Sequence, residues 1–394
     1  MEVIINLESN HCQAALVSFP LASSTSKIFL KNLVSIVVPN VEKLYVISNL
    51  SISEFNEKVN IIDLEISLHH RSETNRALLS TLFQFLKIML IQIKICFILT
   101  RIRHKIDVVF FYVGGVNLLL PTITSKLINK KVISSALGLA SKSYGGAGQK
   151  VLSKVFARIE KIIFYLSDYI IVESPKTVYS LNLEKYQTKI FPYGARYIDT
   201  KIFKFKDQCR HPLLIGYIGR LEEEKGVSNL MEAIPLVLNN KDDIKFLFCG
   251  DGPLFNKIKY DIKEKSLESF IDVVGWVSHD KVPEYLHKIS LLILPSFSEG
   301  LPTIVLEAMA CGTPVLATPV GGICDVIKDG ETGFIMEDNS PECIAKNILR
   351  VLDYPQLNEV IKKAYTVIKK HYTYQSAVER YNLLFCSINK GNIT

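Results

Sequence analysis

Two carboxylates and one hydroxyl in the stretch 295–314 have a spacing that suits a nucleotide. Glu299 lies in a polar loop, and Thr303 and Glu307 lie in the short helix predicted to follow Pro302. Thr303 and Glu307 are four residues apart, so they share one helix face about 6 Å apart along the axis. A helix N-terminus attracts anions, and a carboxylate one turn later can accept hydrogen bonds from ribose hydroxyls. The stretch therefore predicts a nucleoside diphosphate site, although two Glu on an ordinary surface helix would give the same spacing.

Two cations in another part of the chain could complete that site. Arg220 and Lys225 follow an apolar strand that begins at Leu213, and a helix is expected to start near Val227. The carboxyl end of a strand in an open α/β sheet faces the crevice where ligands bind. Two cations beside a helix N-terminus favour a diphosphate, since Arg can donate two parallel hydrogen bonds. The alternative is that both cations only neutralise Glu222–Glu224.

The elements that must position these residues are short apolar runs separated by helical segments. Leu291–Leu294, directly before the glutamate stretch, has the length of a buried parallel strand. In the first half of the chain most strand-like runs are separated by helical segments, which predicts a parallel sheet with crossover helices. These runs are Ala14–Phe19, Lys43–Ser48, Val59–Leu64, Asp107–Val113, Lys131–Ala136 and Asp168–Glu173.

Length and composition limit the class of protein. A chain of 394 residues predicts two domains, and 48% apolar residues suffice for two cores. The eight Cys form no C-x-x-C pair, so neither a disulfide framework nor a cysteine metal site is predicted, and a reducing, cytoplasmic setting fits best. The N-terminus lacks the pattern of a signal peptide. A net charge of +7 and a mean hydropathy of +0.22 favour an anionic membrane surface as partner, and no nucleic-acid-binding motif is present.

A long helix is predicted over residues 77–105, and it has three possible environments. Its polar residues lie on one narrow stripe, and a basic cluster, Arg101–Lys105, follows at its end. It could pack against the sheet of its own domain, lie on an anionic bilayer, or span the bilayer. Two Lys within the stretch argue against spanning.

Five motifs in order over roughly residues 190–335 resemble the family-4 (group 1) retaining glycosyltransferases of the GT-B fold. They are G-R-x4-K-G at 219–226, G-D-G-P at 250–253, G-W at 275–276, E-x7-E at 299–307, and G-G with D-G-x-x-G at 321–333. The resemblance implies an α/β protein with two Rossmann-like parallel-sheet domains facing across a cleft. Residues 1–203 would form the acceptor-side domain and 204–372 the donor-binding domain, with a C-terminal helix, 373–390, crossing back to the first.

The resemblance also implies roles for the candidate residues. Arg220 and Lys225 would stabilise the departing diphosphate, Glu299 would orient the donor sugar, and Glu307 would hold the ribose hydroxyls. No metal and no cofactor would be needed, because the nucleotide-sugar is itself the substrate and no D-x-D triplet occurs. Trp276 could stack on the nucleotide base or belong to the core. Further donor-binding positions would be Gly219, Gly250, Gly252, Ser298, Gly300, Leu301 and Thr303.

The acceptor side departs from the family pattern. Ser24 stands in a hydroxyl-rich segment where relatives have a Gly-Gly loop, and it could contact an acceptor or only cap a helix. Tyr112, Gly114 and Gly115 end a strand where relatives often have His. The glycine-rich stretch 143–150 could be an acceptor-side loop or a plain linker.

The expected activity is transfer of a sugar from a UDP- or GDP-sugar to a glycan or lipid-linked acceptor. The resemblance implies a role in surface polysaccharide or glycolipid biosynthesis, with possible peripheral contact to the inner face of the membrane through residues 77–105. Two other functions stay open at this point. One is a nucleotide-sugar epimerase, and the other is a non-catalytic homologue that binds a nucleotide-sugar or a partner protein.

Overall fold

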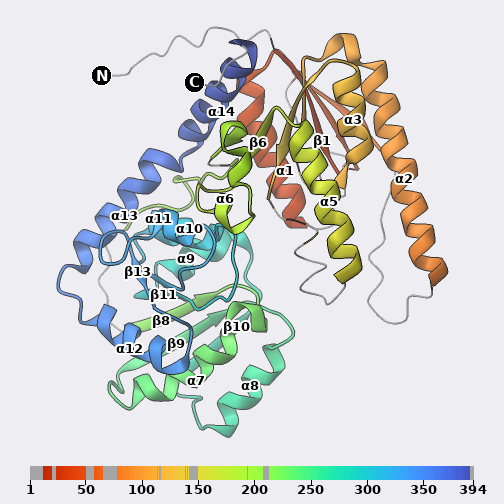
Figure 1. Cartoon of the computed structure of the whole chain (residues 1–394). Helices are drawn as coiled ribbons and strands as arrows, with labels where there is room; N and C mark the ends of the chain where they lie inside the picture. The colour runs from red at the N-terminus through yellow and green to blue at the C-terminus, as the bar shows by residue number, and fades with distance from the viewer. Residues whose placement is uncertain are drawn as a thin grey trace, which may run out of the picture. The chain divides into compact units, whose positions relative to one another are not determined.

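The structure is a computed structural model, and it describes residues 12–19, 24–49, 57–64, 78–112, 114, 117–137, 139, 141, 150–192, 194–206 and 213–390. The chain divides into two compact units (Figure 1). The first unit comprises residues 1–173, 181–195 and 377–394, and the second comprises residues 174–180 and 196–376. The C-terminal residues from Ala377 onward thus belong to the first unit.

The first unit is built on a seven-stranded parallel sheet in the order β3-β2-β1-β4-β5-β6-β7. Its helices include α1 (Ser24–Val37), α2 (Leu78–Arg101), α3 (Leu119–Leu127) and α5 (Lys150–Leu166), and most of α14 (Tyr374–Lys390) belongs to the same unit. The strands are β1 (Gln13–Ser18), β2 (Lys43–Ser48), β3 (Val59–Asp63), β4 (Val108–Phe111), β5 (Lys131–Ser135), β6 (Tyr169–Ile171) and β7 (Ile190–Phe191).

The second unit repeats this arrangement with a six-stranded parallel sheet in the order β10-β9-β8-β11-β12-β13. The strands are β8 (Leu213–Ile218), β9 (Ile244–Cys249), β10 (Ile271–Gly275), β11 (Leu291–Leu294), β12 (Val315–Ala317) and β13 (Phe334–Ile335). The helices are α6 (Thr177–Ser180), α7 (Val227–Leu238), α8 (Phe255–Glu264), α9 (Val282–Leu286), α10 (Thr303–Cys311), α11 (Ile323–Val326), α12 (Pro341–Leu352) and α13 (Leu357–His371). The predicted α/β class with two Rossmann-like parallel sheets is confirmed.

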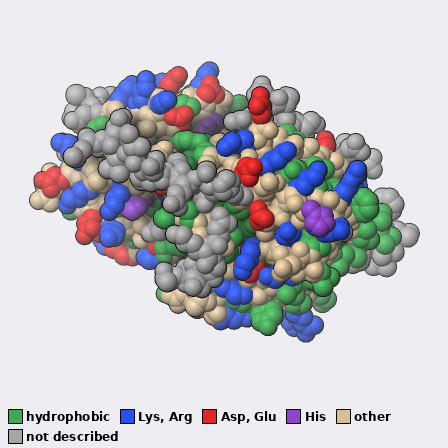
Figure 2. All heavy atoms as spheres, turned by 90° about the horizontal axis from the view of Figure 1, so that it is seen from above, with side chains coloured by type: hydrophobic (Ala, Val, Ile, Leu, Met, Phe, Trp, Pro, Cys, Tyr) green, Lys and Arg blue, Asp and Glu red, His purple; other side chains and the backbone are tan. Residues whose placement is uncertain are grey.

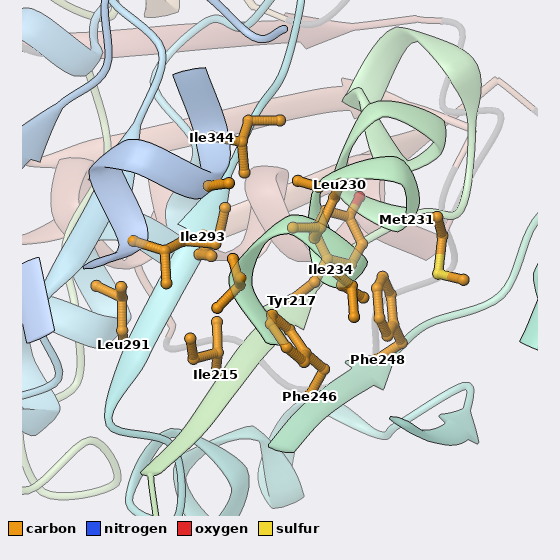
Figure 3. Packing of buried hydrophobic residues seen from close by; sticks show 14 of the residues in the cluster. Ile215, Tyr217, Leu230, Met231, Ile234, Phe246, Phe248, Leu291, Ile293 and Ile344 are labelled. Carbon is orange, nitrogen blue, oxygen red and sulfur yellow. The ribbon is translucent and has the colours of Figure 1, made fainter. Parts of the chain in front are cut away.

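Apolar side chains cover both faces of the second sheet. On one face, Tyr217 and Phe246 from the strands pack with Leu230 and Ile234 of α7 (Figure 3). On the other face, Leu292 and neighbouring strand residues pack with the buried side of α10. Burial on both faces explains why the strands are nearly continuous hydrophobic runs. In the central strands β8 and β11, polar side chains can therefore leave the sheet only at the strand ends and loops, and the candidate residues lie there.

Helix α2 packs against the first sheet along one side only. Ile91, Ile95 and Leu99 are buried in the same cluster as strand residues of β1 and β4. Leu90 and Phe97, on the opposite side, are largely exposed. The packing alternative is thus confirmed for one face of α2. Within the described residues, no helix combines the length and the apolar character needed to cross a membrane.

Candidate active site

The candidate donor site lies between β8 and β11, where the order in which the chain adds strands to the second sheet reverses. Strands β8 and β11 are neighbours in this sheet, and the chain winds outward from them to β9 on one side and β12 on the other. Ligands of open α/β sheets bind at the carboxyl ends of the strands at such a switch point. The loop 219–226 follows β8 and the loop 295–302 follows β11, so both candidate motifs start at this point.

Close backbone contact joins these loops, and glycine is required for it. The Phe297 amide donates to the Glu224 carbonyl over 2.9 Å. Gly226 has a φ of +68°, and a Cβ there would lie 2.0 Å from the Pro295 carbonyl oxygen. A Cβ on Gly250 would likewise lie 1.8 Å from the carbonyl oxygen of Gly219. Loop packing alone therefore accounts for glycine at these positions.

Lys225 and Glu299 form an ion pair between the two loops. Lys225 Nζ lies 2.9 Å from Glu299 Oε1, and Ser296 Oγ donates to the same oxygen over 2.8 Å. The two side chains are only 16% and 12% exposed. The predicted diphosphate cation and the predicted sugar-orienting carboxylate are thus brought together, although 74 residues separate them in sequence.

Arg220 lies at the same strand end but extends into solvent. Its Nη1 is 2.7 Å from Glu222 Oε1, and its side chain is 65% exposed. The alternative that the two cations only neutralise Glu222–Glu224 thus describes Arg220, whereas Lys225 pairs with Glu299. The exposed guanidinium stays accessible to an anion.

The remaining donor-side predictions fall on or beside α10. Thr303 is the first residue of this helix, and Pro302 precedes it in extended conformation. Ser298 and Gly300 are exposed, and a Cβ on Gly300 would meet no atom within 4 Å. Leu301 is buried in the core, so only its backbone could face a ligand.

Arg196 is a functional candidate that the sequence analysis did not identify. Its Nη1 donates to Thr303 Oγ1 over 2.5 Å, which brings a guanidinium to the N-terminal end of α10. The two residues are 107 positions apart. Only tertiary packing brings them together, and none of the five motifs includes Arg196.

His279 is a second candidate that was missed. It lies in the turn His279–Lys281 after β10, and its Nε2 is 2.6 Å from Glu307 Oε1. The Glu307 side chain is 5% exposed and that of His279 is 62% exposed. The hydrogen bond to Glu307 raises the pKa of His279 above its ordinary value. The predicted ribose carboxylate is therefore partnered by an imidazole.

The residues predicted on the acceptor side are only partly described. Tyr112 is buried and packs edge-on against Phe110, with ring centroids 5.9 Å apart. Gly114 has a φ of +72°, a conformation that favours glycine. The Ser24 side chain, Gly115 and residues 142–149 of the glycine-rich stretch lie outside the described residues.

Trp276 does not belong to the core of the second unit. It follows β10 and is 75% exposed, so the core alternative for this side chain is wrong. Among the described residues, no three His, Cys, Asp or Glu side chains are placed to hold a metal ion.

Comparisons with known proteins agree with this architecture. Residues 199–366 match the family model described as glycosyl transferases group 1. The chain is 32% identical over 162 residues to an uncharacterized glycosyltransferase of Methanocaldococcus jannaschii, covering 41% of this chain and 44% of that protein. A second uncharacterized glycosyltransferase of that organism is 28% identical over 283 residues, 68% of this chain and 72% of the relative.

Among solved structures, HepE of Anabaena in complex with UDP superposes with a TM-score of 0.70 at 16% identity. That match covers 95% of this chain and 100% of HepE. The first curated match, by contrast, spans less than half the length of the relative. Residues 199–366 therefore match the group 1 glycosyl transferase family, and the chain has the GT-B fold of these solved structures.

Proposed function

We propose that this protein transfers a sugar from a UDP- or GDP-sugar to an acceptor hydroxyl with retention of configuration. One observation carries the proposal. The carboxyl ends of β8 and β11 bring together Lys225, Glu299 and the start of α10, so cations and carboxylates meet at the switch point of the sheet.

The geometry supports a division of roles within this site. Lys225, Arg220 and the N-terminal end of α10 would balance the charge that develops on the departing diphosphate, an electrostatic contribution that needs no metal ion. Glu307 would accept hydrogen bonds from the ribose, one helical turn beyond Thr303. Glu299, held by Lys225 and Ser296, would orient the donor sugar. The leaving phosphate would assist removal of the acceptor proton, so no general base is assigned.

Acceptor-dependent release of nucleoside diphosphate tests this function. The purified protein is incubated with UDP- and GDP-sugars in EDTA, with and without a panel of glycan and lipid-linked acceptors. We expect release that requires an acceptor and falls at least tenfold in Glu299→Ala, while this variant still binds the bare nucleotide. The complex of HepE with UDP makes UDP-sugars the first donors to test.

The two alternative functions predict other results. An epimerase would interconvert the donor sugar without any acceptor. A non-catalytic homologue would bind the donor and release no nucleotide with any acceptor. Either result would contradict the proposed transfer.

We propose in addition that α2 holds the protein peripherally on the anionic inner face of a membrane, where a lipid-linked acceptor would be available. Leu86, Leu90, Ile93 and Phe97 are spaced by four, three and four residues, so they form one stripe, and each is between 52% and 68% exposed. Exposed basic residues of Arg101–Lys105 follow at the end of the helix. Figure 2 shows hydrophobic side chains beside basic ones at the edge where α2 lies. An apolar stripe with adjacent cations suits an anionic bilayer surface.

Vesicle flotation tests this surface. We expect the protein to float with vesicles containing phosphatidylglycerol and to float poorly with pure phosphatidylcholine, because the cations contribute to binding. The double variant Leu90→Ser/Phe97→Ser should lose flotation. Leu383→Ser is a matched control, since Leu383 of α14 is 68% exposed and lies away from α2 in sequence. If the double variant floated as well as Leu383→Ser, α2 would not be the membrane-binding surface.

A further inference from the structure

Glu307 is a nearly buried carboxylate with a single hydrogen-bond partner among the described residues. Only Oε1 is engaged, by His279 Nε2 at 2.6 Å, and the side chain is 5% exposed. A buried carboxylate without a partner is costly, and the contact with His279 supplies a partner for Glu307. The second oxygen, Oε2, makes no hydrogen bond to a described residue and is left for a ligand.

The imidazole is itself held in place on its other side. Its ring packs on Phe203, with centroids 5.4 Å apart and planes inclined by 51°. Phe203 is buried in the core of the second unit. The ring thus lies between an aromatic core residue and the carboxylate, although most of its surface is open to solvent. A side chain confined in this way can fix the orientation of its partner.

We propose that His279 is a positioning residue for ribose recognition: it holds Oε1 of Glu307 so that Oε2 accepts from the ribose hydroxyls. This inference rests on the proposed function, which assigns the ribose to Glu307. It adds a residue from a different strand end, the one after β10, to the donor site. Two acidic groups, Glu307 and Asp280, act on His279 and favour its protonated, donating form.

The test compares UDP with 2′,3′-dideoxy-UDP, which lacks the ribose hydroxyls, by titration calorimetry. A hydrogen bond to a carboxylate contributes enough that wild type should bind UDP about ten- to a hundred-fold more tightly than the dideoxy nucleotide. In His279→Ala this ratio should fall to within about threefold of one. His279→Gln can donate from a side-chain amide at similar reach, and it should recover part of the ratio. Lys281→Ala, in the same turn, is the control and should keep the wild-type ratio.

The outcomes separate this inference from the function on which it rests. If Glu307→Ala abolishes the ratio and His279→Ala keeps it, Glu307 binds ribose without help from His279, and the inference alone is overturned. If His279→Ala weakens both nucleotides equally, the residue has only a structural role in the turn, and the inference again fails. If Glu307→Ala keeps the ratio, or wild type shows none, both the ribose assignment and the inference are wrong.

Discussion

Replacing Lys225 with Met should destabilise the second unit through the carboxylate that it leaves behind. Two unit charges separated by 2.9 Å, as here, interact by about 6 kcal/mol at an effective dielectric constant of about 20. Desolvation of both groups offsets much of that attraction. Breaking a fully buried pair costs about 3–5 kcal/mol, and exposed pairs contribute about 0.2–1 kcal/mol. Because the side chains are 16% and 12% exposed and Ser296 still donates to Glu299, we expect a loss of about 2–3 kcal/mol.

Thermal unfolding followed by circular dichroism measures this loss. For a domain of this size the melting temperature should fall by about 4–12 °C. Glu299→Gln should cost less, because the amide can still accept from Ser296. The double variant Lys225→Met/Glu299→Gln should lose less unfolding free energy than the two single variants lose together. The difference, which is the coupling energy of the pair, should be about 1–2 kcal/mol.

A solvent-exposed pair in the same unit provides the control. Lys257 Nζ lies 3.8 Å from Glu223 Oε1, and the two side chains are 57% and 65% exposed. Lys257→Met should change the unfolding free energy by less than about 0.5 kcal/mol. If Lys225→Met behaved like this control, or if the double-variant cycle gave no coupling, the assignment of a nearly buried ion pair would be refuted.

Two further perturbations test other contacts of the site. Gly226→Ala should lower the unfolding free energy by at least about 1–2 kcal/mol, because φ is +68° and the added Cβ meets the Pro295 carbonyl. Gly300→Ala is the control and should leave stability near wild type, because its Cβ would meet no atom. Denaturant titration of both variants measures the difference. Because its bond to Glu307 raises the pKa of His279, the stability contributed by the pair should be complete below pH 6.5 and be lost as pH rises through the raised value. The melting-temperature difference between wild type and His279→Ala should therefore shrink between pH 6 and 9, and a difference that grew with pH would contradict the pairing.

Local sequence features were sufficient to predict the framework of the donor unit. The apolar run Leu291–Leu294 became β11, and the helix expected after Pro302 became α10 with Gly312 in a left-handed conformation at its end. The four-residue spacing of Thr303 and Glu307 follows directly from helical geometry. Such features depend on neighbouring residues, and propensity and capping rules describe them well.

The side-chain partners could not be predicted, because they depend on which strands become neighbours. Lys225 meets Glu299, and Glu307 meets His279, only after β8, β11 and β10 take their places in the sheet. The exposure of Trp276 has a similar cause, since a lone aromatic residue after a strand carries no local sign of which side it faces. The two-sided character of α2 was also hidden, since buried and exposed faces of this helix are both apolar.

Binding of a nucleotide-sugar at the carboxyl ends of β8 and β11 is the central claim, and titration calorimetry tests it most directly. Wild type and Arg220→Ala are titrated with a panel of UDP- and GDP-sugars in EDTA. We predict saturable binding of one donor to wild type and at least about tenfold weaker binding to Arg220→Ala, because a charge-assisted hydrogen bond to the diphosphate is lost. Binding that required a divalent metal would contradict the metal-independent site. Equal binding by both proteins, or no binding of any donor, would contradict the placement of the diphosphate at Arg220 and with it the proposed donor site.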